Sequence, residues 1–197
     1  AFVADLADAL GLAAADHVRE VARRLPGRPV VLQLDEPGLP AILAGAIPTT
    51  SGLGRLAAVP AAQAMAALHQ VTSAVGGPVV LHCCGGGLFD VARSGGFEGV
   101  SWDATVSLDD TIGDDVAETA EAGVGVLPGI VAVDGSDTVD SAWHRLTSLW
   151  ARTGLGSAAG RRVAVTPACG LAGASPQAAR GALATSAAVQ ARVAAWE

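Results

Sequence analysis

The sequence predicts an α/β fold built on a parallel sheet, and three observations support this prediction. Short runs rich in Val, Leu and Ile recur along the 197 residues, separated by longer segments with helical apolar spacing. The runs are continuously apolar, which is typical of parallel strands covered by helices on both faces. Polar and sulfur-bearing residues follow directly after several runs, which is where parallel α/β folds place their active sites.

The first part of the chain contains an opening helix, a strand and a long connection. Apolar spacing predicts a helix from about Ala4 to Leu25, stopped by Pro26-Gly27, and then a strand over 29–34. We expect a loop from about Gly38 to Val59, and its length marks it as a functional loop. A helix from Pro60 to Ala74 follows, because proline is favoured in a first helical turn.

The rest of the chain repeats the alternation. Strands are predicted over 79–81, 99–102, 124–127 and 162–165, and helices over about 88–94, 112–122, 136–153 and 175–196. These elements form about five βα units, whereas a complete (β/α)8 barrel has eight units and typically about 250 residues. A self-contained open sheet is the alternative, but no Gly-rich nucleotide loop follows its first strand. We therefore predict a single domain over 1–197, an incomplete (β/α)8 barrel comprising about its last five βα units.

Composition argues against several classes of partner. A formal net charge of −7 disfavours nucleic acid and anionic membranes. No segment approaches the roughly 18 apolar residues of a membrane span, and no basic segment resembles the start of a signal peptide. Three cysteines, two of them adjacent, suit metal binding in a reducing compartment better than a disulfide framework. We expect a cytoplasmic protein, and the Ala at position 1 suggests a fragment of a longer one.

The most informative motif is His82-Cys83-Cys84, which ends the apolar run over 78–81. Successive side chains of a strand point to opposite faces, so His82 and Cys84 share a face while Cys83 points away from it. Cys169 ends a second apolar run. If the two strand ends meet, an imidazole and two thiolates make most of a zinc site. The alternative is a buried histidine with core thiols.

Short segments at successive strand ends form an ordered set. They are Gln33-Leu34-Asp35-Glu36-Pro37, His82-Cys83-Cys84, Val100-Ser101-Trp102-Asp103, Pro128-Gly129-Ile130-Val131 and Thr166-Pro167-Ala168-Cys169-Gly170-Leu171. The set resembles the C-terminal catalytic barrel of the cobalamin-independent methionine synthase family, in the uroporphyrinogen decarboxylase/methionine synthase-like superfamily. The corresponding family motifs are Q-[IL]-D-E-P, H-x-C, I-S-I-E, P-G-V and N-P-D-C-G-L. Their order agrees throughout, and the likeness covers nearly the whole chain.

The resemblance implies a zinc-dependent methyltransferase of methionine biosynthesis. His82, Cys84 and Cys169 would bind zinc, and Asp103 would be the fourth ligand in place of the family's glutamate. The alternative for Asp103 is a carboxylate that orients His82 without touching the metal. No catalytic residue is implied beyond this metal site.

The resemblance also implies the substrates. Asp35, with Glu36 as the second candidate, would hold the amino group of homocysteine, and the alternative is a structural hydrogen bond to a loop backbone. The methyl group would pass from a methyl-folate to the zinc-bound thiolate of homocysteine, because the thiolate is the reactive form of sulfur. One departure concerns the family's proton-donating histidine, which is replaced here within the stretch Ala132-Val133-Asp134-Gly135.

Two alternatives stay open beside this prediction. The first is a zinc methyltransferase on the same barrel that uses another thiol acceptor or methyl donor. The second is a non-catalytic zinc-binding remnant, because the resemblance places three strands and part of the amino-acid pocket before this segment. An incomplete barrel exposes the edges of its first and last strands, and we expect self-association there.

Overall fold

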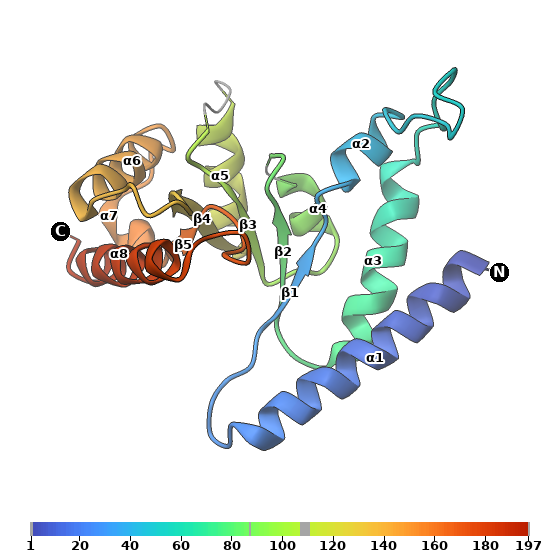
Figure 1. Cartoon of the computed structure of the whole chain (residues 1–197), viewed down its shortest axis with the longest axis horizontal. Coiled ribbons are helices and arrows are strands. Elements are labelled where there is room, and N and C mark those ends of the chain that lie inside the picture. Colours follow the sequence, from blue (N-terminus) through green and yellow to red (C-terminus); the bar gives the residue numbers. More distant parts are fainter. Residues whose placement is uncertain (1, 87, 107–110, 197) are drawn as a thin grey trace. The chain divides into compact units, whose positions relative to one another are not determined.

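The computed structural model describes residues 2–86, 88–106 and 111–196. Its contacts divide the chain into two compact units, which we call unit 1 (residues 1–82 and 90–98) and unit 2 (residues 83–89 and 99–197). Figure 1 labels the elements of both units along the chain. The acidic pair Asp109-Asp110 precedes the helix predicted over about 112–122, where it would cap that helix or face solvent, and it lies outside the described residues.

Unit 1 joins a helical pair to a pair of parallel strands. The long helices α1 (Phe2–Arg24) and α3 (Ala61–Val75) pack against each other. Gly11 makes this close packing possible, because a Cβ there would lie 3.0 Å from the Cβ of Ala74. Strands β1 (Leu32–Asp35) and β2 (Val79–Cys83) pair in parallel, and the short helix α4 (Phe89–Ser94) follows β2.

Strand β1 departs from the prediction in length and in burial. It begins at Leu32 and not at residue 29, and Val31 just before it is 55% exposed. Along β1 half-buried leucines alternate with exposed polar residues, whereas every residue of β2 is buried. The expectation of a strand covered on both faces is therefore confirmed for β2 and wrong for β1.

The long connection after β1 contains structure that the sequence analysis missed. Helix α2 (Leu39–Leu43) lies at its start, with a proline in the first turn, where the missing backbone N–H costs nothing. Further on, an antiparallel bridge joins Pro48 to Arg55 and closes a polar turn. The Thr49 N–H donates to the Gly54 carbonyl at 2.9 Å inside this turn. The predicted loop is thus a short helix followed by a turn held by its own hydrogen bonds.

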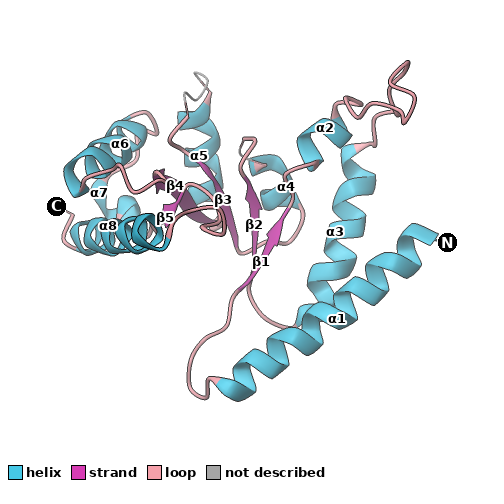
Figure 2. Cartoon of the chain, in the orientation of Figure 1, coloured by secondary structure: helices cyan, strands magenta, loops and turns pink. Residues whose placement is uncertain are grey.

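Unit 2 alternates strands and helices regularly. Its elements are β3 (Gly99–Asp103), α5 (Ile112–Glu121), β4 (Gly125–Val131), α6 (Val139–Ala151), α7 (Ser157–Gly160), β5 (Thr166–Pro167) and α8 (Pro176–Ala194). Strand β4 pairs in parallel with both β3 and β5. Figure 2 shows these strands together with the helices that alternate with them. Trp102, Ile130 and Leu146 are fully buried and form the centre of this unit's core.

The last strand differs from its prediction. We expected it over 162–165, but β5 consists only of Thr166 and Pro167. The backbone just before it bonds to a side chain of α8: the Val165 N–H donates to Gln190 Oε1 at 2.7 Å, and Gln190 Nε2 donates to the Val163 carbonyl at 3.1 Å. Backbone groups in part of this apolar run therefore hydrogen-bond to a helix side chain and not to a neighbouring strand. Helix α7 was not predicted either.

The strand order identifies the fold class. The five strands follow one another as β1-β2-β3-β4-β5, and helices alternate with them along the chain. Sequential parallel strands joined by helices are the topology of a (β/α)8 barrel, of which this chain supplies an incomplete set. The predicted incomplete α/β barrel is confirmed.

Candidate metal centre

The strand β2 positions the first two candidate ligands. His82 lies in this buried strand and is 6% exposed, and Cys83 beside it is 1% exposed. The chain turns immediately after Cys83, so Cys84 is only half-buried. Cys83 therefore lies in the core, as strand alternation predicted, and the side chains of the buried His82 and the half-buried Cys84 share the other face.

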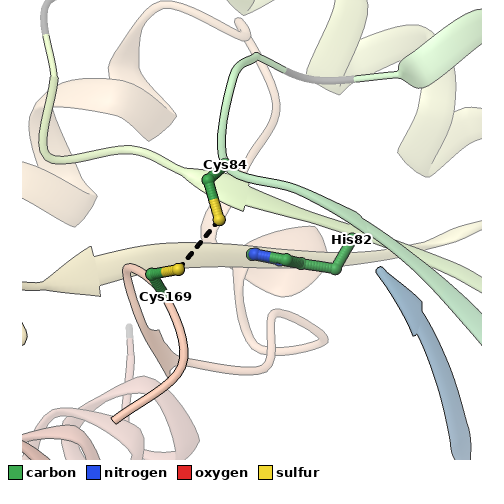
Figure 3. Close-up of side chains that lie close together, drawn as sticks. All are labelled: His82, Cys84 and Cys169. Atoms are coloured by element: carbon green, nitrogen blue, oxygen red, sulfur yellow. Dashed lines mark hydrogen bonds between the residues drawn. The ribbon is translucent and has the colours of Figure 1, made fainter. Parts of the chain in front are cut away.

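Cys169 completes a group of three. The Sγ atoms of Cys84 and Cys169, which are 85 residues apart in sequence, lie 2.9 Å from each other. One ligand atom each from His82, Cys84 and Cys169 lies within 4.8 Å of the other two, and these residues form a group that can hold a metal ion. Figure 3 shows the imidazole and the two sulfurs converging. The predicted meeting of two strand ends is thus observed.

Glycine at position 129 lets the segment that carries Cys169 approach β4. A Cβ on Gly129 would lie 2.6 Å from Ala168 Cα, 2.9 Å from the Pro167 carbonyl oxygen and 2.7 Å from that of Trp102. All three neighbours are backbone atoms, which cannot swing aside as a flexible side chain can. The Ala168 N–H then donates to the Val131 carbonyl at 2.8 Å, which fixes the backbone one residue before Cys169. The sequence analysis used Gly129 only as part of a motif and missed this role.

The electrostatics of the sulfur pair favour a bound cation. Burial raises the pKa of the Cys84 thiol to about 12, and the hydrogen bond with Cys169 and the charges of Cys169, Cys83 and Asp103 add to this shift. Without a cation, Cys84 is therefore a thiol and not a thiolate at neutral pH. A bound dication reverses this preference, because it stabilises the anionic ligand directly.

The donor set fits zinc. Two cysteine sulfurs and one imidazole are preferred zinc ligands, and three protein ligands leave a fourth tetrahedral position open. None of the three cysteines, all of which lie in the described residues, forms a disulfide. In a tetrahedral site with Zn–S bonds of about 2.3 Å the sulfurs lie about 3.8 Å apart, so Cys84 and Cys169 would separate by about 1 Å.

Asp103, the predicted fourth ligand, does not belong to the group of three. It ends β3, and its Oδ1 accepts hydrogen bonds from the Thr105 N–H at 2.8 Å and the Thr105 hydroxyl at 2.6 Å. Its charge contributes to the raised pKa of Cys84, so it lies within electrostatic reach of that sulfur. Ligation by Asp103 stays a prediction.

The two candidate substrate carboxylates follow β1 at its carboxyl end. Asp35 lies opposite His82 in the β1–β2 register, and the Glu36 N–H donates to the His82 carbonyl at 2.8 Å. Asp35 is exposed, because the residues of β1 alternate between half-buried and exposed. Its Oδ1 accepts from Gln33 Nε2 at 2.7 Å. Burial, followed by the charge of Asp35, raises the pKa of the half-buried Glu36 carboxyl.

A partly buried ion pair after β4 was missed by the sequence analysis. Asp137 Oδ2 accepts from Arg145 Nη1 at 3.0 Å and from the Ala132 N–H at 2.7 Å, and Arg145 also donates to the Ile130 carbonyl. The Asp137 side chain is only 8% exposed. Burial alone would raise the pKa of Asp137, but the hydrogen bonds from Arg145, Ala132 and Ser141 together lower it. The sequence signal that could have pointed to this region is the capping box of Thr138 and Ser141 at the start of α6.

These features define an incomplete α/β barrel whose strand ends gather a histidine and two cysteines able to hold a metal. A family model described as the cobalamin-independent synthase catalytic domain matches residues 4–192, and the chain belongs to this family. The match includes both units and every candidate site residue from Asp35 to Cys169. A comparison with curated proteins gave no match. Within the described residues no helix has the length and apolar character needed to cross a membrane.

Proposed function

We propose that this chain carries the zinc site of a methyltransferase that converts homocysteine to methionine with a methyl-folate as donor. One observation carries the proposal: His82, Cys84 and Cys169 converge within 4.8 Å in a chain that belongs to the cobalamin-independent synthase catalytic domain family. The family supports methyl transfer, and the donor set supports zinc.

His82, Cys84 and Cys169 would hold the ion. When bound, zinc supplies a Lewis acid that keeps a substrate thiol ionised at neutral pH. The imidazole of His82 is buried, whereas Cys169 is exposed, so we propose that substrate approaches the site from the Cys169 side. The two anionic sulfurs donate electron density and so keep the substrate sulfur nucleophilic.

Asp103 is proposed as the exchangeable fourth ligand. Both hydrogen bonds from Thr105 end on Oδ1, so Oδ2 is the oxygen that can turn toward a metal. A carboxylate is a harder ligand than a thiolate and leaves zinc more readily when a thiol arrives. Release from the metal would leave the bonds from Thr105 intact, so the loop would keep its place.

Asp35 is proposed to contact the amino group of the substrate, with Glu36 as the second candidate. Asp35 is exposed and lies at the carboxyl end of a strand, the usual place for substrate-binding residues in a barrel. The raised pKa of Glu36 makes Asp35 the better anion of the two.

We also propose the setting of this function. Three cysteines outside any disulfide suit the reducing cytoplasm, and the net charge of −7 gives no attraction for nucleic acid or anionic membrane. Self-association is proposed through β1, which stands at the end of the strand order and pairs with β2 on one edge, so that its other edge offers backbone groups for pairing.

Metal content of the purified protein tests the proposal. We expect one tightly bound zinc per chain after dialysis, lost in Cys84→Ser and kept in Cys83→Ala, which changes the neighbouring thiol that points into the core. Wild-type protein that is folded but takes up no zinc would contradict the proposal. Formation of methionine from homocysteine and a methyl-folate then separates this function from a zinc methyltransferase with other substrates and from a zinc-binding remnant.

A further inference from the structure

The two sulfurs of the metal centre are close enough to react with each other. The Sγ atoms of Cys84 and Cys169 lie 2.9 Å apart, and both residues belong to unit 2. A disulfide bond joins its sulfurs at about 2.05 Å, whereas two cysteine sulfurs on one zinc lie about 3.8 Å apart. The observed separation lies between these two states, about 1 Å from either.

Protein contacts hold the backbone just before each of these cysteines. Cys83, which precedes Cys84, ends the buried strand β2. The N–H of Ala168, which precedes Cys169, donates to the Val131 carbonyl at 2.8 Å. Neither contact involves a ligand atom of the metal centre. The two sulfurs are therefore kept near each other whether or not the site holds an ion.

Glycines follow both cysteines and lie in open surroundings. Gly86 comes two residues after Cys84, and Gly170 directly follows Cys169. A Cβ on either glycine would meet nothing within 4 Å. The chain is thus anchored before each cysteine and unpacked after it, which favours the approach of about 1 Å that a disulfide requires.

The three cysteines differ in their access to solvent. Cys169 is exposed and Cys84 is half-buried, whereas Cys83 is only 1% exposed. Oxidation of cysteine follows exposure, so a dissolved oxidant reaches Cys169 first. Cys84 is the neighbour that can then react with the oxidised sulfur, because Cys83 points into the core.

We propose that Cys84 and Cys169 form a reversible disulfide when the protein meets a peroxide, and that this bond and zinc exclude each other. The Cys169 thiolate attacks one peroxide oxygen, the O–O bond breaks, and hydroxide leaves, so that Cys169 becomes a sulfenic acid. The Cys84 sulfur then attacks the Cys169 sulfur, the S–O bond breaks, and the departing hydroxide takes the Cys84 proton as water. Two electrons pass from the sulfurs to the peroxide.

The disulfide would switch the metal centre off. The inference rests on the proposed function only for the identity of the ion. Zinc binds cysteine as a thiolate, so the disulfide removes two of the three ligands and leaves His82 alone. Disulfides that form in a reducing compartment are typically transient and redox-sensing, and a thiol reductant restores the ligands by exchange.

Hydrogen peroxide added to the reduced chain, followed by mass spectrometry of its peptides, tests the disulfide. Cleavage after arginine places Cys84 in peptide 56–93 and Cys169 in peptide 163–180. We expect these peptides to be joined with the loss of two hydrogens. The zinc-loaded chain should release its zinc to a chromogenic chelator as the link forms, and dithiothreitol should restore both thiols and zinc uptake.

Two variants identify the sulfurs involved. Cys83→Ala leaves Cys84 as the cysteine of peptide 56–93 and should form the link and release zinc as the wild type does. Cys84→Ser should form no link between the two peptides. A Cys83→Ala chain that oxidises without joining the peptides would overturn the inference, and so would a linked chain that keeps its zinc. Reduced wild type that takes up no zinc but still forms the link would remove the proposed function and leave the disulfide standing.

Discussion

Strands β1 and β2 are paired neighbours, yet their carboxyl ends are built in opposite ways. β2 is buried along its whole length and delivers His82 at 6% exposure, whereas β1 alternates and leaves Asp35 exposed. The metal end is thus fixed by packing, whereas the exposed side chain of Asp35 accepts a hydrogen bond from Gln33. Burial suits ligands that must keep their geometry, while exposure suits a residue that must exchange water for substrate.

The largest effect on stability is expected from a substitution that crowds the packed backbone around the Cys169 segment. Gly129→Ala places a Cβ within 3.0 Å of three backbone atoms around the Cys169 segment. We expect a loss of about 3 kcal/mol or more in the free energy of unfolding and a weaker zinc site, measured by urea denaturation and metal titration. Gly156→Ala is the control, since a Cβ there meets nothing within 4 Å. Unchanged stability and zinc binding in Gly129→Ala would show that the segment is not tightly packed.

The second-largest effect is expected at the partly buried ion pair of Asp137 and Arg145. Asp137→Asn removes the charge that faces Arg145 and should cost about 1–3 kcal/mol at pH 7, measured by urea denaturation. The pKa of Asp137 is lowered in the folded protein, so its stabilisation is present above the unfolded pKa of about 3.9 and is lost as pH falls through the folded pKa. The difference between wild type and variant should therefore shrink below about pH 4. Asp140→Asn, at an exposed pair, should cost less than about 1 kcal/mol, and an equal cost in both variants would contradict the argument.

Zinc affinity should depend on pH in a predictable direction. The pKa of Cys84 is raised to about 12 without metal, so the ion must displace a proton from this thiol across the whole neutral range. The apparent affinity should rise at least about tenfold per pH unit between pH 6 and 8, since each displaced proton contributes one factor of ten. Competition with a chelator of known affinity measures it. An affinity independent of pH would mean that Cys84 does not ligate as a thiolate.

The sequence predicted the packed parts of the molecule better than the exposed parts. Apolar runs and strand alternation were enough for β2 and for the burial of Cys83, while the family resemblance implied the meeting of Cys84 with Cys169. The exposure of Asp35 was not predictable, because it depends on what covers β1 and not on the residues of β1 themselves.

Backbone contacts between distant segments also could not be predicted from the sequence. Nothing local shows that Gln190 bonds the backbone at Val163 and Val165 and so shortens the last strand. The close approach that requires Gly129, and the pairing of Asp137 with Arg145, likewise appear only in three dimensions. The family resemblance supplied the zinc ligands, while the folded chain supplies the reasons that they are held in place.

The smallest effect on stability is expected at Asp35, at the exposed carboxyl end of β1. Asp35→Asn keeps an oxygen that can accept from Gln33, so the free energy of unfolding should change by less than about 0.5 kcal/mol. Zinc content should be unchanged, because Asp35 is outside the group of metal-binding residues. Binding of homocysteine should weaken nonetheless, since the substrate ammonium loses a charged partner. A large loss of stability or zinc in Asp35→Asn would show that the end of β1 is as much a part of the packed framework as the end of β2.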